Sequence, residues 1–96
     1  MKLIFAIYYR GLCHYIGYTE NLPRRLHQFS SIAFYNNKIK KQDASDEFIE
    51  FLKFYQEKSS YCKVLVLEKD LELSESIMKK KEYIKTFKPK YNMLDS

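Results

Sequence analysis

The sequence predicts an α+β fold: a small three-stranded antiparallel sheet flanked by about three helices. Two runs rich in apolar and aromatic residues, at 2–10 and 12–18, meet at the dipeptide Arg10-Gly11, which is typical of a β-hairpin. Further along the chain, segments with helical spacing of apolar residues enclose one more β-rich run, at 61–68. The resulting order, strand-strand-helix-helix-strand-helix, favours an α+β architecture with a mainly antiparallel sheet.

The first two runs form the predicted hairpin. Gly11 suits its turn because glycine adopts positive φ at little cost. Because successive side chains alternate across a strand, we expect Tyr8 and Tyr15 to project from one face of the hairpin. The same alternation places His14 on the face opposite to that of Tyr15.

The first helix is predicted from about Leu22 to about Ala33. Asn21 is a favoured N-cap residue, and Pro23 is tolerated in a first helical turn because its missing N–H needs no partner there. The segment "NNKIKKQ" at 36–42 is predicted to be a polar connection.

A second helix is expected to follow, with Asp43 or Ser45 as its N-cap residue. Its apolar residues recur with helical spacing: Phe48, Phe51, Leu52 and Tyr55. The run "YCKVLVLE" then predicts the third strand.

The last helix is predicted from Leu71 to Phe87, and Pro89 ends it. Its apolar residues are expected on one stripe: Leu73, Ile77, Ile84 and Phe87. The segment "KYNML" at 90–94 is predicted to be short and extended.

The 96 residues fit one domain, 1–96, with a single modest core. A net charge of +5 favours an anionic partner, with nucleic acid as the first candidate, although solubility alone would also account for this charge. The apolar run "LIFAI" is too short for a membrane span or a secretory signal. Cys13 and Cys62 form no metal-ligand pattern and indicate reduced thiols in an intracellular, soluble protein, with a single disulfide as the alternative.

One short stretch gathers several groups that can bind a phosphodiester. Tyr8 and Tyr15 lie in the predicted hairpin, and Arg24 and Arg25 lie at the start of the helix after it. Phenolic hydroxyls, guanidinium groups and a helix N-terminus all bind phosphate oxygens. For any one of these residues alone, a half-buried strand position or a solvated helix face is the simpler interpretation.

The order of these residues resembles that of the GIY-YIG nuclease family. Four segments carry the resemblance over nearly the whole chain: Ala6-Ile7-Tyr8, Tyr15-Ile16-Gly17, "GYTENLPRR" at 17–25 and "IKTFKPKYN" at 84–92. The resemblance implies a three-stranded antiparallel sheet flanked by helices. It also implies hydrolysis of phosphodiester bonds in DNA with one divalent metal, Mg²⁺ or Mn²⁺.

Roles for individual residues follow from the same resemblance. Tyr15 would position or activate the attacking water, Tyr8 would support it by hydrogen bonding, and Arg25 would neutralise charge on the scissile phosphate. Contacts with nucleic acid are implied for Thr19, Arg24, Lys80 and Lys90, and supporting roles for Gly17, Asn21 and Asn92. Where relatives often carry a histidine one turn beyond the arginine, this chain has Phe29, and a surface role is favoured for His27.

The sequence departs from the family at the expected metal ligand. Counting back from Ile84 and Pro89, the position of the family's glutamate is occupied by Lys80. Mg²⁺ requires oxygen ligands, and an ammonium cannot lower the pKa of a bound water. The alternatives are that a nearby carboxylate replaces the ligand or that Lys80 simply reaches solvent within the basic run 79–81. The candidate carboxylates are Glu72, Glu75 and Glu82.

Two functions therefore remain open from the sequence. The first is a DNA endonuclease of the GIY-YIG type, impaired to some degree by Lys80. The second is an inactive DNA-binding module of the same fold, or a competitor of a true nuclease. A protein-binding role ranks below both. Three alternatives stay open for specificity on DNA: a separate protein partner supplies it, oligomerisation supplies it, or the chain has none.

Overall fold

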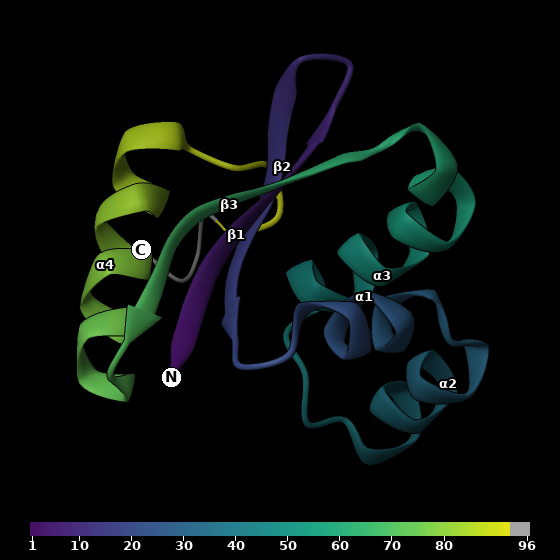
Figure 1. Ribbon diagram of the computed structural model, residues 1–96. Helices are drawn as coiled ribbons and strands as arrows, with labels where there is room; N and C mark the ends of the chain where they lie inside the picture. The colour runs from purple at the N-terminus through teal and green to yellow at the C-terminus, as the bar shows by residue number, and fades with distance from the viewer. Residues whose placement is uncertain (93–96) are drawn as a thin grey trace.

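The computed structural model describes residues 1–92, which form a three-stranded sheet with helices on both faces (Figure 1). Its strands are β1 (Lys2–Tyr9), β2 (Leu12–Thr19) and β3 (Lys63–Leu71). The order is β2-β1-β3 and both pairings are antiparallel, so β1 is the central strand. The run Ile4–Ile7 is fully buried because the central strand is covered on both faces.

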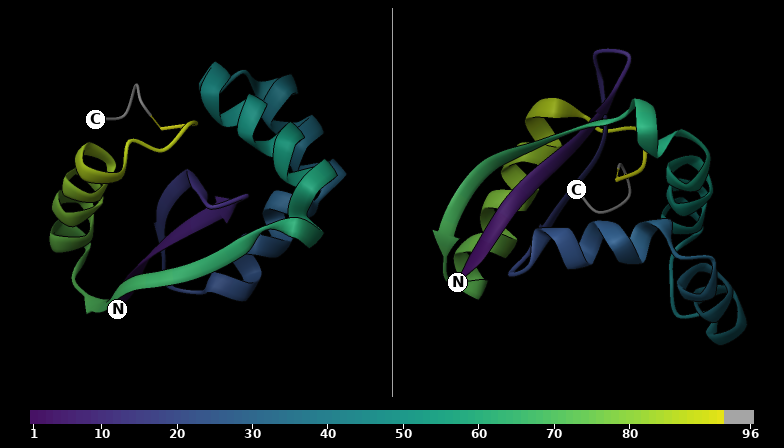
Figure 2. Two further views of the ribbon diagram at one scale, coloured as in Figure 1. Left: turned by 90° about the horizontal axis from the view of Figure 1, so that it is seen from above. Right: turned by 45° about the vertical axis from the view of Figure 1, so that its right-hand side comes forward.

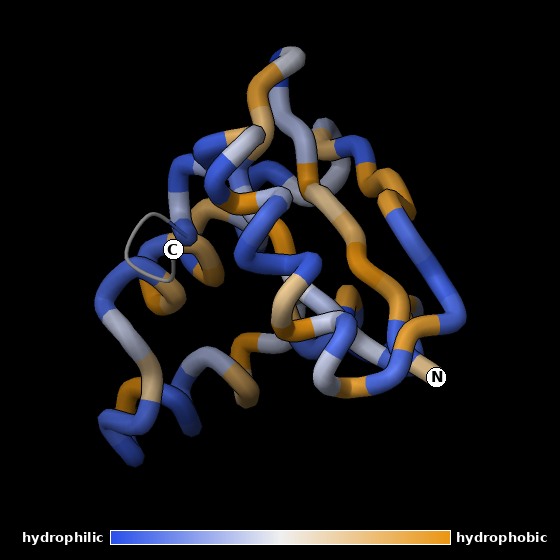
Figure 3. The backbone as a smooth tube through the Cα atoms, turned by 90° about the vertical axis from the view of Figure 1, so that its left-hand side faces the viewer, coloured by the Kyte–Doolittle hydropathy of each residue, from blue (hydrophilic) through white to orange (hydrophobic). Residues whose placement is uncertain are grey.

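The helices are α1 (Leu22–Ser30), α2 (Ile32–Lys41), α3 (Asp46–Lys58) and α4 (Leu73–Phe87), with a single 3₁₀ turn, η1, at Ser59–Tyr61. Helix α4 covers one face of the sheet, while α1 and α3 lie on the other (Figures 1 and 2). Hydrophilic residues predominate along α2, which buries no residue (Figure 3). The predicted α+β class is thus confirmed, with one helix more than expected.

Each face of the sheet has its own buried cluster, because alternate residues of β1 point to opposite faces. The cluster beneath α1 and α3 is largely aromatic and comprises Phe5, Ile7, Tyr15, Phe29, Phe51, Leu52 and Tyr55. The cluster beneath α4 is smaller and comprises Ile4, Ala6, Ile16, Leu71 and Ile84.

A β-bulge in the hairpin overturns the prediction that Tyr8 and Tyr15 share a face. Ile7 pairs with Tyr15, but the next residue, Tyr8, pairs with Cys13, so His14 is the extra residue. Tyr8 therefore packs with the cluster beneath α4, and Tyr15 with the cluster beneath α1 and α3. The predicted placement of His14 is also wrong, because its ring stacks on Phe54 of α3, with the ring centroids 4.8 Å apart.

The connection predicted at 36–42 is mostly helical. Helix α1 ends at Ser30, and Ser31 leaves the helical region with φ −82° and ψ 122°. The Ser31 hydroxyl accepts a hydrogen bond from the Phe34 amide at 3.2 Å and so begins a new helix, α2. The lysines of the last turn of α2 stabilise its C-terminal end through the helix dipole. The boundary predicted at Ala33 is therefore wrong.

The remaining elements agree with the prediction within a few residues. Ser45, not Asp43, caps α3, since its hydroxyl accepts from the Phe48 amide at 3.1 Å. In α4 the predicted stripe is only partly buried, because Leu73 and Ile77 are 52% and 39% exposed whereas Ser76 and Ile84 are buried.

Within residues 1–92, no helix is long and apolar enough to cross a membrane. Cys13 and Cys62 are free thiols, so the structure contains no disulfide between them. Part of the extended segment predicted at 90–94, namely 93 and 94, lies outside the described residues.

Candidate nucleic-acid interface

Arg25 lies over aromatic rings at the start of α1. Its guanidinium carbon is 4.8 Å from the ring centroid of Phe29, 5.8 Å from that of Phe48 and 5.9 Å from that of Phe34. Nη1 also donates a hydrogen bond to Oε1 of Gln28 at 3.0 Å. No ion pair involves Arg25 in the part of the chain that the structure describes. The guanidinium is therefore held in place by rings and an amide, and its charge can still interact with an anion.

Arg25 and Tyr15 line one pocket of about 350 Å³. Tyr15 is 8% exposed and its ring stacks on Phe51, with centroids 4.2 Å apart and an interplanar angle of 14°. Lys38 and Asp43 line the same pocket and form an ion pair of 3.7 Å. The structure thus brings together two of the three residues to which the resemblance gives a catalytic role.

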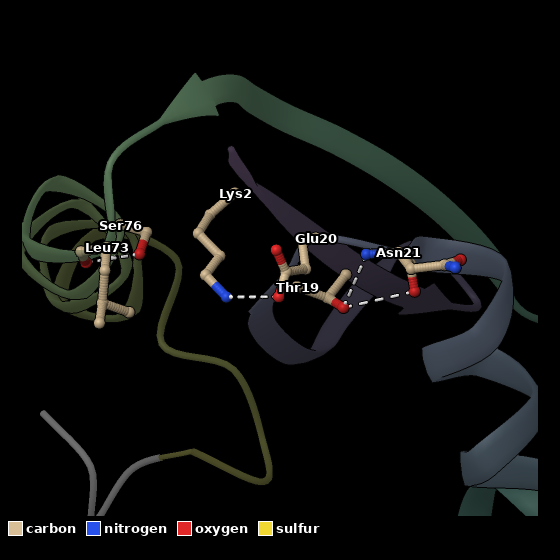
Figure 4. Close-up of polar contacts among 6 residues, drawn as sticks. All are labelled: Lys2, Thr19, Glu20, Asn21, Leu73 and Ser76. Atoms are coloured by element: carbon tan, nitrogen blue, oxygen red, sulfur yellow. Dashed lines mark hydrogen bonds and ion pairs between the residues drawn. The ribbon is translucent and has the colours of Figure 1, made fainter.

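A second pocket, of about 270 Å³, lies where β2 ends and α1 begins. Arg24 and Arg25 line it together with Tyr18 and Lys2, and the Lys2 ammonium forms an ion pair of 3.2 Å with Glu20 (Figure 4). Three cations and one exposed carboxylate leave this surface basic.

The turn into α1 is fixed by local hydrogen bonds. Asn21 caps the helix by accepting a hydrogen bond from the Arg24 amide at 3.1 Å. The Thr19 hydroxyl accepts from the Asn21 amide at 3.2 Å and donates to the Asn21 carbonyl at 3.3 Å (Figure 4). Since Pro23 has no N–H and the Arg25 amide bonds to the Asn21 carbonyl, most donors of this helix N-terminus are already used. A phosphate at this surface would therefore be bound by the arginine side chains.

Lys80 approaches this surface from the other side of Tyr18. It is half-buried on α4, and its ammonium nitrogen is 5.6 Å from the Tyr18 ring centroid. This contact shows that Lys80 packs against β2 instead of extending freely into solvent. We call Lys2, Arg24, Arg25 and Lys80, grouped around Tyr18, the basic patch.

The carboxylates near Lys80 do not form a metal site. The Glu75 carboxylate accepts a hydrogen bond from the Glu72 amide at 3.1 Å in the capping box of α4. Glu82 is exposed. Across residues 1–92, no three His, Cys, Asp or Glu side chains are grouped so that they could hold a metal ion. At position 80 the chain therefore offers an ammonium, which cannot ligate a divalent cation that binds through oxygen ligands.

Tyr8 does not join Tyr15 and Arg25. Burial raises the pKa of the Tyr8 hydroxyl, and nearby Cys13 raises it further. On Tyr15's own face of the sheet, the β1 residue in ring contact with it is Phe5, with centroids 6.1 Å apart, and Phe5 has no hydroxyl. Tyr8 is thus absent from this pocket, and the second tyrosine that lines it is Tyr91.

Asn92 lies against Ile16, in the segment Tyr15-Ile16-Gly17. Its side-chain oxygen accepts a hydrogen bond from the Ile16 amide at 2.8 Å, and its side-chain nitrogen donates to the Ile16 carbonyl at 2.9 Å. The Tyr91 and Lys90 amides donate to the carbonyls of His14 and Cys13 at 2.9 and 3.3 Å. The segment 90–92 therefore occupies the outer edge of β2.

The other predicted residues are placed as follows. Gly17 lies beneath Tyr15, since a Cβ atom there would come within 2.8 Å of the Tyr15 ring. Lys90 is exposed, with its ammonium 5.3 Å from the Tyr91 ring centroid, and His27 is exposed as well. Sequence reasoning missed Lys38 and Phe34, because only the unexpected helix α2 brings them to Arg25.

The chain has the fold of GIY-YIG endonuclease domains. It is similar to the crystal structure of the N-terminal GIY-YIG endonuclease domain of UvrC from Thermotoga maritima, with a TM-score of 0.53. The similarity covers 94% of this chain and 80% of that chain, at 17% sequence identity. That structure is a point mutant bound to its catalytic divalent cation. No protein-family model and no curated protein matches the sequence.

Proposed function

We propose that this chain is a DNA-binding module of the GIY-YIG fold that has lost metal-dependent hydrolysis. One observation carries the proposal: the Lys80 ammonium packs over Tyr18 of β2, and it stands at the position on α4 where the family resemblance implies a metal-binding carboxylate. A cation at this position attracts phosphate but repels a metal ion.

The charges of the basic patch support binding to DNA. Arg25 has no carboxylate partner within residues 1–92, and Arg24 is exposed beside it. A guanidinium group can bind two phosphate oxygens through two parallel hydrogen bonds. Lys80 adds a third cation from α4, on the other side of Tyr18.

Binding can be measured by fluorescence anisotropy with a labelled DNA duplex between about 50 and 200 mM salt. Affinity should fall steeply with salt, and Arg25→Ala should weaken binding and reduce the salt slope by about one. Lys53→Ala, an exposed change on α3, is the matched control. A duplex that does not bind at low salt would refute the proposal.

Cleavage is tested with a supercoiled plasmid in Mg²⁺ or Mn²⁺. The proposal predicts that the wild-type chain nicks the plasmid no faster than Arg25→Ala does. Lys80→Glu should allow metal-dependent nicking, whereas Lys81→Glu, an exposed change one residue along α4, should not. If both glutamate variants behave alike, the importance assigned to position 80 is wrong.

A second candidate is the DNA endonuclease itself, favoured by the shared pocket of Tyr15 and Arg25. The plasmid assay separates the two functions. Nicking by the wild type that exceeds nicking by Arg25→Ala and requires a divalent metal would establish the endonuclease.

We further propose that 1–96 act as one domain inside the cell, since both cysteines are free thiols. Specificity on DNA would come from a protein partner.

A further inference from the structure

A third pocket lies away from the basic patch, at the tip of the hairpin. It has a volume of about 790 Å³, within the range of about 300–1,000 Å³ that is usual for ligand sites. The hairpin tip forms one wall, and η1 with the start of β3 forms the other. The tip extends beyond the helices, as Figures 1 and 2 show. We call this cavity the hairpin pocket.

The hairpin pocket is separate from the Arg25 site. Strand β2 has eight residues and runs from the hairpin turn to the start of α1. At 3.2–3.4 Å per residue, its ends are roughly 23 Å apart. None of the residues that line the hairpin pocket belongs to the basic patch.

Three tyrosines and three cations line this pocket, with no carboxylate among its lining residues: Tyr8, Tyr9, Tyr61, Arg10, Lys58 and Lys63. Tyr61 is 72% exposed, so a face of its ring is open to a ligand. The Arg10 guanidinium carbon is 5.2 Å from the Tyr9 ring centroid. The ion pairs of residues 1–92 include none of the three cations, so their charges are not neutralised within the chain.

The backbone holds the wall of the pocket in a defined shape. Arg10 and Gly11 have φ of 52° and 77°, which is the two-residue hairpin turn that matches the twist of the strands. Tyr8 pairs with Lys63 across β1 and β3, so the two walls are joined by the sheet. The pocket is thus built from the sheet itself.

We propose that the hairpin pocket binds an unpaired segment of nucleic acid. A base would stack on Tyr61, and Lys58, Lys63 and Arg10 would contact the flanking phosphates. Stacking platforms combined with a cationic groove are the usual means of binding single strands, and paired bases within a duplex cannot present their faces in this way. An acidic peptide would match the charges but would leave the rings without a partner. This site does not depend on the function proposed for the basic patch.

The test is fluorescence anisotropy with labelled hexathymidylate at low salt. Tyr61→Ala should weaken binding at least about fivefold, because a stacked base is worth that much or more. Tyr61→Phe, which keeps the ring, should bind like the wild type. Tyr61 is exposed, so neither change affects the core. Equal binding by the wild type and Tyr61→Ala would overturn the proposal.

The contribution of the pocket's positive charge to binding is tested with lysine variants on β3. Lys63→Gln should reduce the slope of log affinity against log salt by about 0.7, the value for one phosphate of a single strand. Lys69→Gln, an exposed lysine near the other end of the same strand, is the control and should leave the slope unchanged. If labelled hexaglutamate binds as tightly as hexathymidylate, the pocket recognises acidic peptides and the proposal is wrong.

Arg25→Ala separates this site from the function proposed above. If Arg25→Ala binds hexathymidylate like the wild type and Tyr61→Ala binds it more weakly, the hairpin pocket is supported. This holds even if the chain does not bind duplex DNA. If Arg25→Ala weakens hexathymidylate binding and Tyr61→Ala does not, the single strand binds at the basic patch. The proposal for the hairpin pocket is then refuted.

Discussion

Replacement of Asn92 by alanine should destabilise the protein strongly. Asn92 is fully buried, and its side-chain amide bonds both the N–H and the C=O of Ile16, at 2.8 and 2.9 Å. Alanine would leave both backbone groups without a partner. A buried group without its hydrogen bond costs about 1–3 kcal/mol, so the loss of two should lower the free energy of unfolding of Asn92→Ala by about 2–6 kcal/mol.

Urea denaturation at neutral pH measures this loss directly. For a domain of this size, about 2 kcal/mol corresponds to a fall in Tm of at least about 8 °C. Asn37→Ala is the matched control, because Asn37 is exposed on α2 and its loss should change stability by no more than about 0.5 kcal/mol.

Asn92→Asp tests the reasoning more closely. Its carboxylate can still accept from the Ile16 amide but cannot donate to the Ile16 carbonyl at neutral pH. We expect a loss at least as large as that for alanine. If Asn92→Ala unfolds within about 0.5 kcal/mol of the wild type, the two hydrogen bonds do not stabilise the edge of β2 and the argument is refuted.

The remaining predictions concern the hairpin. Gly17→Ala should cost about 1–3 kcal/mol and alter the near-UV circular dichroism of tyrosine, because the new Cβ would lie 2.8 Å from the Tyr15 ring and 2.9 Å from the Phe5 ring. Gly11 has a φ of +77° and open space around it, so Gly11→Ala should cost about 1 kcal/mol and leave the tyrosine spectrum unchanged. Identical spectra for Gly17→Ala and Gly11→Ala would contradict this difference. Burial raises the pKa of the Cys13 thiol from 9.0 to about 11, so its contribution to stability is complete below pH 9 and is lost as the pH rises towards 11. The urea midpoint of the wild type should therefore fall more steeply between pH 9 and 11 than that of Cys13→Ser. If the midpoints of both proteins fall equally with pH, this prediction is wrong.

Local signals in the sequence were sufficient for the hairpin turn and for most helix starts. Gly11 acts through its positive φ. Asn21 and Ser45 each act through a hydrogen bond from the amide three residues further along the chain. The helix break at Ser31 was missed although it has a local signal of the same kind, since serine is a favoured N-cap residue.

The faces of the hairpin could not be predicted by counting residues. A single bulge at His14 changes which residues share a face, and nothing in the alternation of Tyr8 to Tyr15 reveals it. The aromatic surroundings of Arg25 depend on tertiary structure, because Phe34 and Phe48 belong to different helices. The contact of Lys80 with Tyr18 also required the structure, because it joins α4 to β2.

The strand order has a consequence for how the chain folds. The central strand is the first one in the sequence, and one of its edges is completed only by β3, about sixty residues later. Pairings so distant in sequence fold slowly, since a long loop must close before they form. Until then, the apolar strand Lys2–Tyr9 keeps an open edge, which can pair with other chains. A nascent chain that ends before residue 71 would therefore be prone to aggregate, and the sheet becomes protected only when β3 has been made.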